Sequence, residues 1–413
     1  MRQRSVSDGR PGSGSAPAGP AHAGLVVGVL VIAVAFVIYA QSARFFDAGH
    51  PDFFYLADAF LQGRVWLEHQ FGLFDSVVVG NRVYVPFAPF PAIVFLPLVA
   101  LVGPVRAGHW EQVVGAVLAA LDVGLCWWLL SRLGVRSIVD RLWLVVLFGF
   151  STAIWWVTTR GGVWHEGHLV AAMVTFAGLI EAWGRRRPWL MGLLAGAGFL
   201  SRAPLALAGP FFAWVVADDR GVHPLDPRAW PWARWIELGL GVAPAVLFAL
   251  WYNAARFGSP LESGYGLATV PPFLEAQRAR GLFSTSHLGM NLDLLLFHLP
   301  TYIPKPPFFR PDGLGLSILL TSPGLLLALR ANWRSRTVIA LGVTALAVLV
   351  PSLLYYGGGW LQYGYRYALD SIPFVVAIVG LGVARRGLPT WGKVLIVLGV
   401  VVNLTGVYWA YNI

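Results

Sequence analysis

Long apolar runs separated by short polar or arginine-rich stretches make up most of this sequence. Many of the runs approach the length of about 20 residues that a helix needs to cross the hydrocarbon core of a bilayer. They are 24–43, 110–131, 141–158, 167–183, 189–202, 204–217, 234–253, 314–330, 337–356, 368–384 and 391–411. The pattern therefore predicts an all-α, polytopic bundle of about eleven transmembrane helices.

A further apolar run, 87–103, decides the orientation of everything that follows it. It contains three prolines. If this run crossed the membrane, the arginine-rich loops at 132–141 and 185–187 would fall on opposite sides, against the positive-inside bias. We therefore predict that 87–103 does not span and instead forms a proline-broken helix in the outer interface, covered by other parts of the protein.

With this choice, every arginine-rich loop falls on the cytoplasmic side, the N-terminus lies in the cytoplasm and the C-terminus lies outside. The segments 44–109 and 254–313 become large outer loops, the first of them carrying interfacial helices. Residues 1–23 are rich in Gly, Pro, Ser and Ala and predict a disordered basic tail. The sequence thus indicates a multi-pass protein of the cell membrane, with a single domain over 24–413.

Composition and charge narrow the class of protein further. The 413 residues are 57% hydrophobic and 12% charged, which a water-soluble globule could not accommodate. The formal charge of +10 comes from short bursts between apolar runs, which argues against nucleic-acid binding. Cys126 is the single cysteine, so an intrachain disulfide is excluded, and neither a Rossmann nor a P-loop motif is present to bind a nucleotide.

The first outer loop offers a carboxylate at the start of a helix. After Pro51 the spacing is helical and places Asp52 and Tyr55 on one face. Asp52 has two interpretations: a helix N-terminal residue stabilised by the helix dipole, or a general base facing a cleft at the membrane edge. Asp47 and Asp58 are the competing carboxylates for the second role.

A cluster of ionisable residues, WHEGH, stands near the outer end of the run 167–183. His165 and His168 are three residues apart, so on a helix they share a face and could ligate a divalent metal ion together with Glu166. Two alternatives are contact with the acceptor or a phosphate, and ordinary polar capping of a span. The sequence leaves these three interpretations open, and no cofactor is certain.

Two arginines on the outer side are candidates for binding an anion. Arg202 lies between two short apolar runs, just before Pro204, where a guanidinium is costly unless it meets an anion or reaches the interface. Phosphate suits the bidentate geometry of arginine. Arg366 is the second candidate, although Asp370, four residues later, could pair with it on a helix.

The long outer segment 254–313 and the turn at 357–367 combine polar, aromatic and proline residues in a way that suits a lid over an anionic substrate. An ordered loop without contact to substrate is the alternative. The candidates for contact with the acceptor or for the lid are Tyr55, Glu262, Tyr265, His287 and Gln362.

The order of these motifs resembles that of a known superfamily. The chain contains in sequence DFFYLADAFLQGR, YVPFAPFPA, LSRAP, FGSPLESGY, GLGLSILLTSPGLLL and WLQYGYRYALDSIPF. In this order and placement it resembles the GT-C superfamily of polytopic glycosyltransferases, the group that contains protein O-mannosyltransferases and the lipid A aminoarabinose transferase. The resemblance extends over nearly the whole chain.

The resemblance implies a polyprenyl-phosphate sugar as donor and an inverting displacement at the anomeric carbon. By analogy, Asp52 would deprotonate the acceptor hydroxyl, while Arg202, with Arg366 or His168, would stabilise the departing phosphate. Many members carry an Asp-Glu pair in the first loop, whereas Asp52 is followed here by Phe53. Asp47 and Asp58 therefore stay candidates for the base.

Three functions compete at this point. The first is a glycosyltransferase that moves a hexose or pentose from a polyprenyl-phosphate carrier to a glycan, protein or lipid acceptor of the cell envelope. The second is a transporter or flippase of a lipid-linked sugar, which calls for ionisable residues near the midplane of the membrane. Most ionisable residues here are placed at the ends of predicted spans, and Asp122, inside a span, is the exception. The third is a structural membrane subunit, which leaves the crowded outer loops unexplained.

Overall fold

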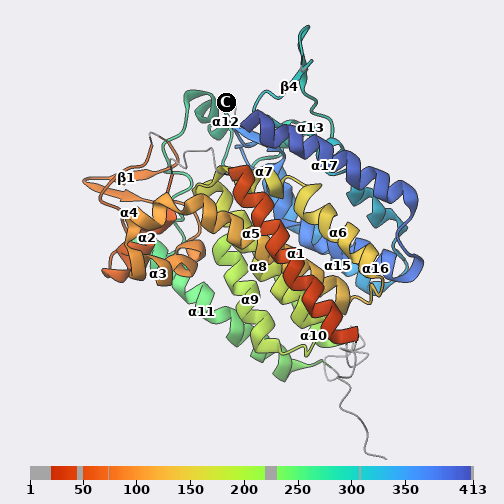
Figure 1. The fold of residues 1–413 in the computed structure, drawn as a ribbon. Helices are drawn as coiled ribbons and strands as arrows, with labels where there is room; N and C mark the ends of the chain where they lie inside the picture. The colour runs from red at the N-terminus through yellow and green to blue at the C-terminus, as the bar shows by residue number, and fades with distance from the viewer. Residues whose placement is uncertain (1–19, 44–49, 73, 219–229, 307, 411–413) are drawn as a thin grey trace, which may run out of the picture.

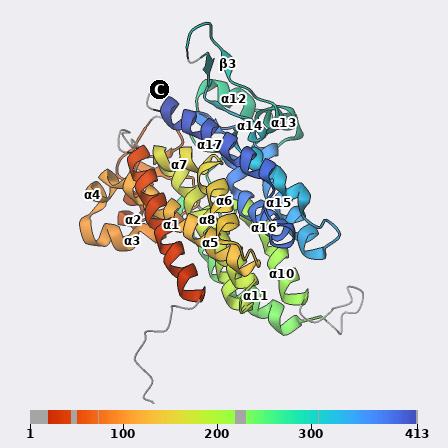
Figure 2. The ribbon, with the colours of Figure 1, turned by 45° about the vertical axis from the view of Figure 1, so that its right-hand side comes forward.

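The computed structural model describes residues 20–43, 50–72, 74–218, 230–306 and 308–410. It is mostly helical (Figures 1 and 2). The α-helices are α1 (Pro20–Ala43), α2 (Asp52–Leu61), α3 (Phe90–Val102), α4 (Pro104–His109), α5 (Glu111–Arg132), α6 (Ile138–Phe150), α7 (Ile154–Arg160), α8 (Val163–Ala182), α9 (Pro188–Ser201), α10 (Gly209–Asp218), α11 (Trp232–Phe257), α12 (Pro272–Arg278), α13 (Leu288–Leu296), α14 (Ile318–Thr321), α15 (Arg336–Leu354), α16 (Ile372–Arg386) and α17 (Thr390–Ala410). Within these residues, 3₁₀ helices accompany them, namely η1 (Ala203–Ala208), η3 (Thr285–His287), η4 (Pro323–Arg330) and η5 (Arg366–Asp370).

In the described part of the chain, three small sheets of two strands each add to this helical framework. Two are antiparallel, β1 (Val77–Val79) with β2 (Arg82–Tyr84) and β3 (Thr301–Tyr302) with β4 (Phe309–Arg310). The third is parallel and joins β5 (Leu314–Leu316) to β6 (Gln362–Gly364), so two segments far apart in the chain lie side by side. The predicted all-α class therefore holds only as a mostly helical fold.

Six helices in the described part of the chain are long and apolar enough to cross a membrane, namely α1, α5, α8, α11, α15 and α17. The pair α6 and α7, bent by 49° at a short break, would make a seventh. A multi-pass membrane protein is thus supported. The prediction of about eleven full-length spans is wrong, because six or seven are found.

The four remaining predicted spans form shorter or interrupted elements. Helix α9 has 14 residues, which gives it a length of about 21 Å against a hydrocarbon core of about 30 Å. It ends at Ser201, and the chain returns through η1 and α10. The run 314–330 begins as strand β5 and continues as α14 and the 3₁₀ helix η4, and α16 has only 15 residues. Apolarity alone did not distinguish these segments from full spans.

The proline-containing run 87–103 forms α3, a helix of 13 residues with Pro97 inside it. It is too short to be a full-length span, in agreement with the prediction that it does not cross the membrane. It packs against α2 and α4, and also contacts α8 and α9. Of the predicted tail, residues 1–19 lie outside the described residues, and α1 begins at Pro20 rather than at residue 24.

The bundle has two chemically different ends. We call the end where α8 and α16 finish and α11 and α15 begin the arginine end. There Arg234 donates a hydrogen bond to the carbonyl of Arg186 at 3.1 Å, and the guanidinium of Arg330 lies 5.9 Å from the Trp391 ring. The opposite end carries α12 and α13 at the top of Figures 1 and 2, while α2 lies with α3 at the left side of the bundle; we call this end, with the start of α8 and α2, the site end.

The two ends agree with part of the predicted topology. The first residues of α1 and the last residues of α17 lie at opposite ends of the bundle (Figure 1). Which end faces the cytoplasm stays a prediction from the arginine bias.

Helices α9 and α11 approach each other through small residues. Gly192 and Gly196 on α9 meet Gly241 and Ala245 on α11, both pairs at a spacing of four. A Cβ added at Gly196 would lie 2.7 Å from the Cβ of Ala245, and one added at Gly192 would overlap the carbonyl oxygen of Leu238. This is the close backbone packing that small residues permit between membrane helices.

We therefore expect Gly192→Ala to destabilise the protein by about 1–3 kcal/mol, because the new methyl group forces the two backbones apart. The measurement is thermal unfolding of the purified chain in detergent. Gly239→Ala is the matched control, because a Cβ at Gly239 of α11 has no neighbour within 4 Å. Equal unfolding temperatures for the two variants would contradict the close approach of α9 and α11.

The loops at the site end form one packed layer rather than separate excursions. Asp75 donates its backbone N–H to the carbonyl of Thr269 at 2.7 Å, and Arg256 donates to the carbonyl of Val85 at 2.7 Å. Phe283 pairs with Tyr355 as an isolated β-bridge, which ties the same layer to the end of α15. The layer therefore holds the first loop, the segment after α11 and the segment after α15 in fixed relation around the start of α8.

Candidate functional site

Asp52 is the first residue of α2 and lies at the site end. Its side chain is 13% exposed, and Oδ2 has no hydrogen-bond partner among the described residues. The nearest basic group is the imidazole of His50, whose Nδ1 lies 3.9 Å from Oδ2. Burial raises the pKa of Asp52 to about 7, and the carboxylate of Asp75 adds to the rise. A carboxyl group with such a pKa can accept or release a proton near neutral pH.

Asp75 is a second carboxylate beside it, and sequence reasoning missed it. Its backbone has a φ of 60°, a left-handed conformation that costs energy for a residue other than glycine. Its Oδ2 accepts a hydrogen bond of 2.9 Å from Nε1 of Trp164, at the start of α8. Asp75 interacts electrostatically with both Asp52 and Arg366, so it lies between the acidic and basic parts of the site.

The start of α8 holds a buried acidic group. Glu166 is fully buried, and neither of its carboxylate oxygens finds a hydrogen-bond partner in the part of the chain that the structure describes. It lies within electrostatic range of Asp52 and Glu111. Glu111, the first residue of α5, accepts a hydrogen bond of 2.6 Å from the backbone N–H of Gly162, just before α8. The carboxylate of Glu111 thereby fixes the N-terminus of α8 against α5.

The predicted metal site at His165, Glu166 and His168 does not form. The described residues contain no group of three or more His, Cys, Asp or Glu side chains that could hold a metal ion. Nδ1 of His165 donates to the carbonyl of Gly161 at 2.5 Å, whereas Nδ1 of His168 is 2.8 Å from Asp370. The two imidazoles share a helix face but are drawn to different partners, so they do not converge on one point.

Asp370 and Arg202 form a buried ion pair that reaches between distant parts of the chain. Nε of Arg202 donates to the two carboxylate oxygens of Asp370 at 3.3 and 3.1 Å, and His168 contacts the same carboxylate. Burial alone would raise the pKa of Asp370, but Arg202 and His168 together hold it below its usual value. Asp370 is therefore a carboxylate that orients Arg202, whose side chain is 15% exposed.

The expected pair between Arg366 and Asp370 is not present, because these residues belong to η5. In a 3₁₀ helix of three residues per turn, positions i and i+4 do not share a face. Arg366 instead donates to the carbonyl of Trp360 at 3.2 Å, and its buried Nε lacks a hydrogen-bond partner among the described residues. The guanidiniums of Arg366 and Arg202 lie 5.1 and 5.6 Å from the ring of Tyr367. Two cations thus gather around one aromatic ring, a favourable place for an anion.

Tyr265 also belongs to this basic part of the site. It comes from the segment after α11 and lies within electrostatic range of Arg202 and Asp370. Its ring packs against Phe87 at 6.1 Å and against Tyr355 at 6.4 Å. That the segment covers a bound substrate stays a prediction.

The competing carboxylates for the base have different fates. Asp58 accepts a hydrogen bond of 2.7 Å from Gln62 on the exposed side of α2, away from the buried groups. Asp47 lies outside the described residues. Tyr55 packs its ring 4.4 Å from that of Phe71, so its ring helps to hold the first loop together.

Three further predicted residues serve local structure. Nε2 of His287 donates to the carbonyl of Gly281 at 2.9 Å. Gln362 donates to the carbonyls of Leu314 and Gly358 at 2.7 and 2.9 Å, across the parallel sheet of β5 and β6. Oε1 of Glu262 accepts from the N–H of Gly264 at 2.7 Å within one turn. Gln362 also accepts a hydrogen bond of 3.2 Å from the backbone N–H of Arg366. A role of these three residues in a lid or in contact with the acceptor stays a prediction.

The structure therefore brings Asp52, Arg202, Arg366, His168 and Tyr265 to one end of the bundle. It adds residues that sequence reasoning did not assign to the site, namely His50, Asp75, Glu111 and Tyr367. Asp370 is also new to the site as the partner of Arg202. A carboxylate at the very start of an apolar run, as in WEQVVGAV, is the one signal that could have indicated Glu111.

The arrangement has an acidic part with a proton-accepting carboxyl group and a basic part with two arginines. Such a pair of parts can remove a proton from a hydroxyl group and stabilise the negative charge of a leaving phosphate.

Comparison of the chain with protein-family models, with curated proteins and with solved structures gave no match.

Proposed function

We propose that this protein is an integral-membrane glycosyltransferase that uses a polyprenyl-phosphate sugar as donor. The acceptor hydroxyl attacks the anomeric carbon, the bond from that carbon to the phosphate oxygen breaks, and configuration inverts. The acceptor proton passes to a carboxylate, and the leaving group is polyprenyl phosphate, which carries the bonding electron pair. No nucleotide takes part.

The observation that carries this proposal is the state of Asp52. It is a nearly buried carboxyl group with a pKa raised to about 7 and an oxygen without a hydrogen-bond partner in the described chain. Asp52 is the first residue of α2, whose N-cap is Pro51, and a backbone hydrogen bond to the Asp52 carboxyl group only partly offsets the rise of its pKa that burial causes. Asp52 is therefore the group placed to take the acceptor proton.

The arginines supply the second requirement of the reaction. Arg202 uses Nε for Asp370, so the ion pair orients its guanidinium. Arg366 brings a second positive charge to Tyr367, and Asp75 connects it electrostatically to Asp52. The leaving phosphate would lie between these two guanidiniums, which would stabilise its negative charge, while Asp52 removes the proton of the acceptor hydroxyl.

A lipid carrier fits the position of the site at the ends of the candidate spans. Helix α8 begins at Val163, directly beside the acidic cluster, and α15 finishes at Leu354, just before Tyr355. The site therefore lies at the level where an apolar span meets polar loops, which is where the phosphate of a polyprenyl carrier would lie in a bilayer.

The proposal is tested by incubating the purified chain in detergent with synthetic polyprenyl-phosphate hexoses and pentoses and an extract of envelope acceptors. Release of free polyprenyl phosphate is measured by chromatography, together with transfer of labelled sugar. Turnover of one donor is the expected result. Absence of any donor cleavage across the panel would argue against the proposal.

The pH dependence of transfer follows from the raised pKa of Asp52. Only the ionised carboxylate accepts a proton, so the rate should rise with pH through about 7 and fall about tenfold per unit below it. His50, Asp75 and Glu166 face the same carboxyl group and shape the profile. The check is the initial rate of donor cleavage between about pH 5 and about pH 9. A rate that is constant over this range would contradict a base with this pKa.

One observation favours a second function, the transport of a lipid-linked sugar. Asp122 lies within α5, is fully buried and has two carboxylate oxygens without a hydrogen-bond partner in the described residues. Ionisable groups inside spans are typical of ion-coupled transporters. The donor assay separates the two functions, because a transporter leaves the bond between sugar and phosphate intact.

A further inference from the structure

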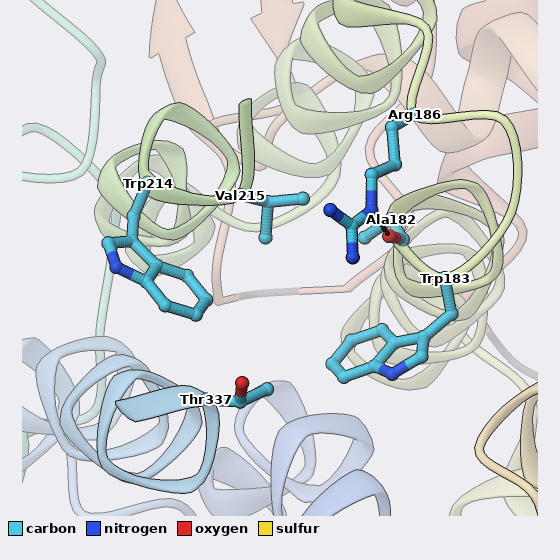
Figure 3. Close-up of a pocket in the computed structure, with 6 residues that line it drawn as sticks. All are labelled: Ala182, Trp183, Arg186, Trp214, Val215 and Thr337. Carbon is cyan, nitrogen blue, oxygen red and sulfur yellow. Dashed lines mark hydrogen bonds between the residues drawn. The ribbon is translucent and has the colours of Figure 1, made fainter. Parts of the chain in front are cut away.

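A polar hollow lies at the arginine end, apart from the residues of the candidate site. It is formed where α8 finishes, α10 passes and α15 begins (Figure 3). The residues that line it are Ala182, Trp183, Arg186, Trp214, Val215 and Thr337. Since the glycosyl-transfer proposal uses none of them, the hollow requires its own explanation.

Arg186 is held over this hollow by an unusual backbone. Its φ is 53°, in the left-handed region, which costs about 1–2 kcal/mol for a residue with a side chain. Its N–H donates to the carbonyl of Glu181 at 3.0 Å and its Nε to the carbonyl of Ala182 at 2.9 Å. These bonds turn the side chain back across the end of α8, so that the guanidinium points into the hollow in Figure 3. Such strain is typical of functional positions.

A second arginine fixes the two walls relative to each other. Arg234 on α11 donates to the carbonyl of Arg186 at 3.1 Å and to the carbonyl of Val216 at 3.2 Å. Val216 follows Val215, which lines the hollow from α10. The hollow is therefore built from the end of α8, the short turn that follows it and α10, and Arg234 of α11 holds the turn and α10 together.

The other sides of the hollow combine apolar rings with a hydroxyl group. Trp183 and Trp214 stand on either side of it, and both rings pack against Phe211 at 6.3 and 6.1 Å. The hydroxyl of Thr337, in the first turn of α15, lies across from Arg186 (Figure 3). A ligand here would meet a guanidinium and a hydroxyl group between two indole rings.

The position of the hollow at the ends of two candidate spans, and the charges around it, favour a lipid as its ligand. Ala182 is the last residue of one candidate span, and Thr337 is the second residue of another, so the hollow lies at the border of the apolar band. Arg185 lies exposed beside it, whereas the nearby acid Glu181 is paired with Arg187 at 2.8 Å. Tryptophan and arginine at this level are typical partners of lipid headgroups.

We propose that this hollow binds the phosphate group of an anionic membrane phospholipid. Arg186 and Thr337 hold the phosphate oxygens, and the indoles of Trp183 and Trp214 contact the glycerol and the upper part of the acyl chains. Inorganic phosphate shares the headgroup chemistry but lacks the apolar part that the indoles recognise. The bound lipid links α8, α10 and α15 at the arginine end.

The test uses the full chain, purified in detergent and stripped of lipid, with phosphatidylglycerol, phosphatidylcholine of the same acyl chains, and inorganic phosphate as probes. Retention of each lipid is measured by native mass spectrometry, and the rise of Tm by thermal unfolding. We expect phosphatidylglycerol to bind and to raise Tm. Arg186→Gln should weaken its binding about tenfold, because a charge-assisted hydrogen bond is lost.

Arg185→Gln is the matched control, because it removes the same charge from an adjacent exposed residue that does not line the hollow. It should bind phosphatidylglycerol as the parent chain does. If Arg186→Gln fails to fold, Thr337→Val decides instead, since it removes only the hydroxyl group and should weaken binding about threefold. Equal binding of both lipids, equal binding by the variants, or the same response to inorganic phosphate alone would overturn the proposal.

Discussion

Replacement of Asp52 by Asn should reduce sugar transfer by about a thousandfold, because a positioned general base contributes roughly 10²–10⁴ to the rate. The change keeps the shape of the side chain and removes only its ability to accept the proton. Since Asp52 is nearly buried and its Oδ2 has no hydrogen-bond partner in the described part of the chain, the amide should not break an existing contact of that oxygen. The measurement is the initial rate of donor cleavage by purified protein.

Asp58→Asn is the matched control on the same helix. Asp58 accepts a hydrogen bond from Gln62 at an exposed position, and its loss should change the rate by less than about threefold. Size-exclusion profiles and unfolding temperatures show whether both variants are folded. If Asp52→Asn keeps full activity while folded, the proton acceptor is another carboxylate, with Asp75 and Glu166 the nearest alternatives in the structure.

Arg202→Lys should lower the rate about a hundredfold with the fold intact. Lysine keeps the positive charge that pairs with Asp370, so the buried carboxylate is not left without a counter-charge. It loses the planar fork that binds two phosphate oxygens at once. Loss of one preorganised donor to a developing negative charge costs about 10²–10³ in rate. The assay is again donor cleavage, with the donor varied to separate kcat from KM.

Arg310→Lys provides the comparison, because Arg310 lies exposed on the β3–β4 hairpin. It should leave kcat within about twofold of the parent chain. An Arg202→Lys variant that transfers sugar at the parental rate would restrict Arg202 to the structural pair with Asp370. The phosphate would then be held by Arg366 and the surrounding tyrosines.

The sequence predicted the membrane class well but not the number of spans. Runs such as 189–202 and 314–330 are also strongly apolar, yet the first forms a helix of 14 residues and the second breaks into a strand and two short helices. Length and hydropathy describe local composition. Whether a run forms one continuous helix depends on its packing partners, as the close contact of Gly192 with α11 shows.

The candidate site was predicted in part for a similar reason. Asp52 and Arg202 flank helix breaks at prolines, and the sequence displays such breaks. The partner of Arg202 could not be read in this way, because Asp370 is 168 positions away and reaches it only through the tertiary fold. Asp75 was hidden likewise, since its left-handed backbone and its contact with Trp164 leave no local pattern.

The two ends of the bundle have different proposed roles. The site end combines Asp52, a carboxyl group with a raised pKa, with Arg202 and Arg366 around the Tyr367 ring. The arginine end presents Arg186 between two tryptophans at the ends of candidate spans. Both would meet phosphate groups of lipids, but with different consequences. In the proposed reaction the phosphate at the site end would be the leaving group, whereas the phosphate proposed at the arginine end would be a fixed headgroup.

The central claim is that Asp52 removes the acceptor proton while the sugar leaves its polyprenyl phosphate. The most direct measurement compares the parent chain and Asp52→Asn in one reaction with a labelled polyprenyl-phosphate sugar, scoring free polyprenyl phosphate and labelled acceptor together. The account predicts both products in equal amounts from the parent chain and about a thousandfold less from the variant. Equal product from both proteins, or an intact donor with the parent chain, would contradict it.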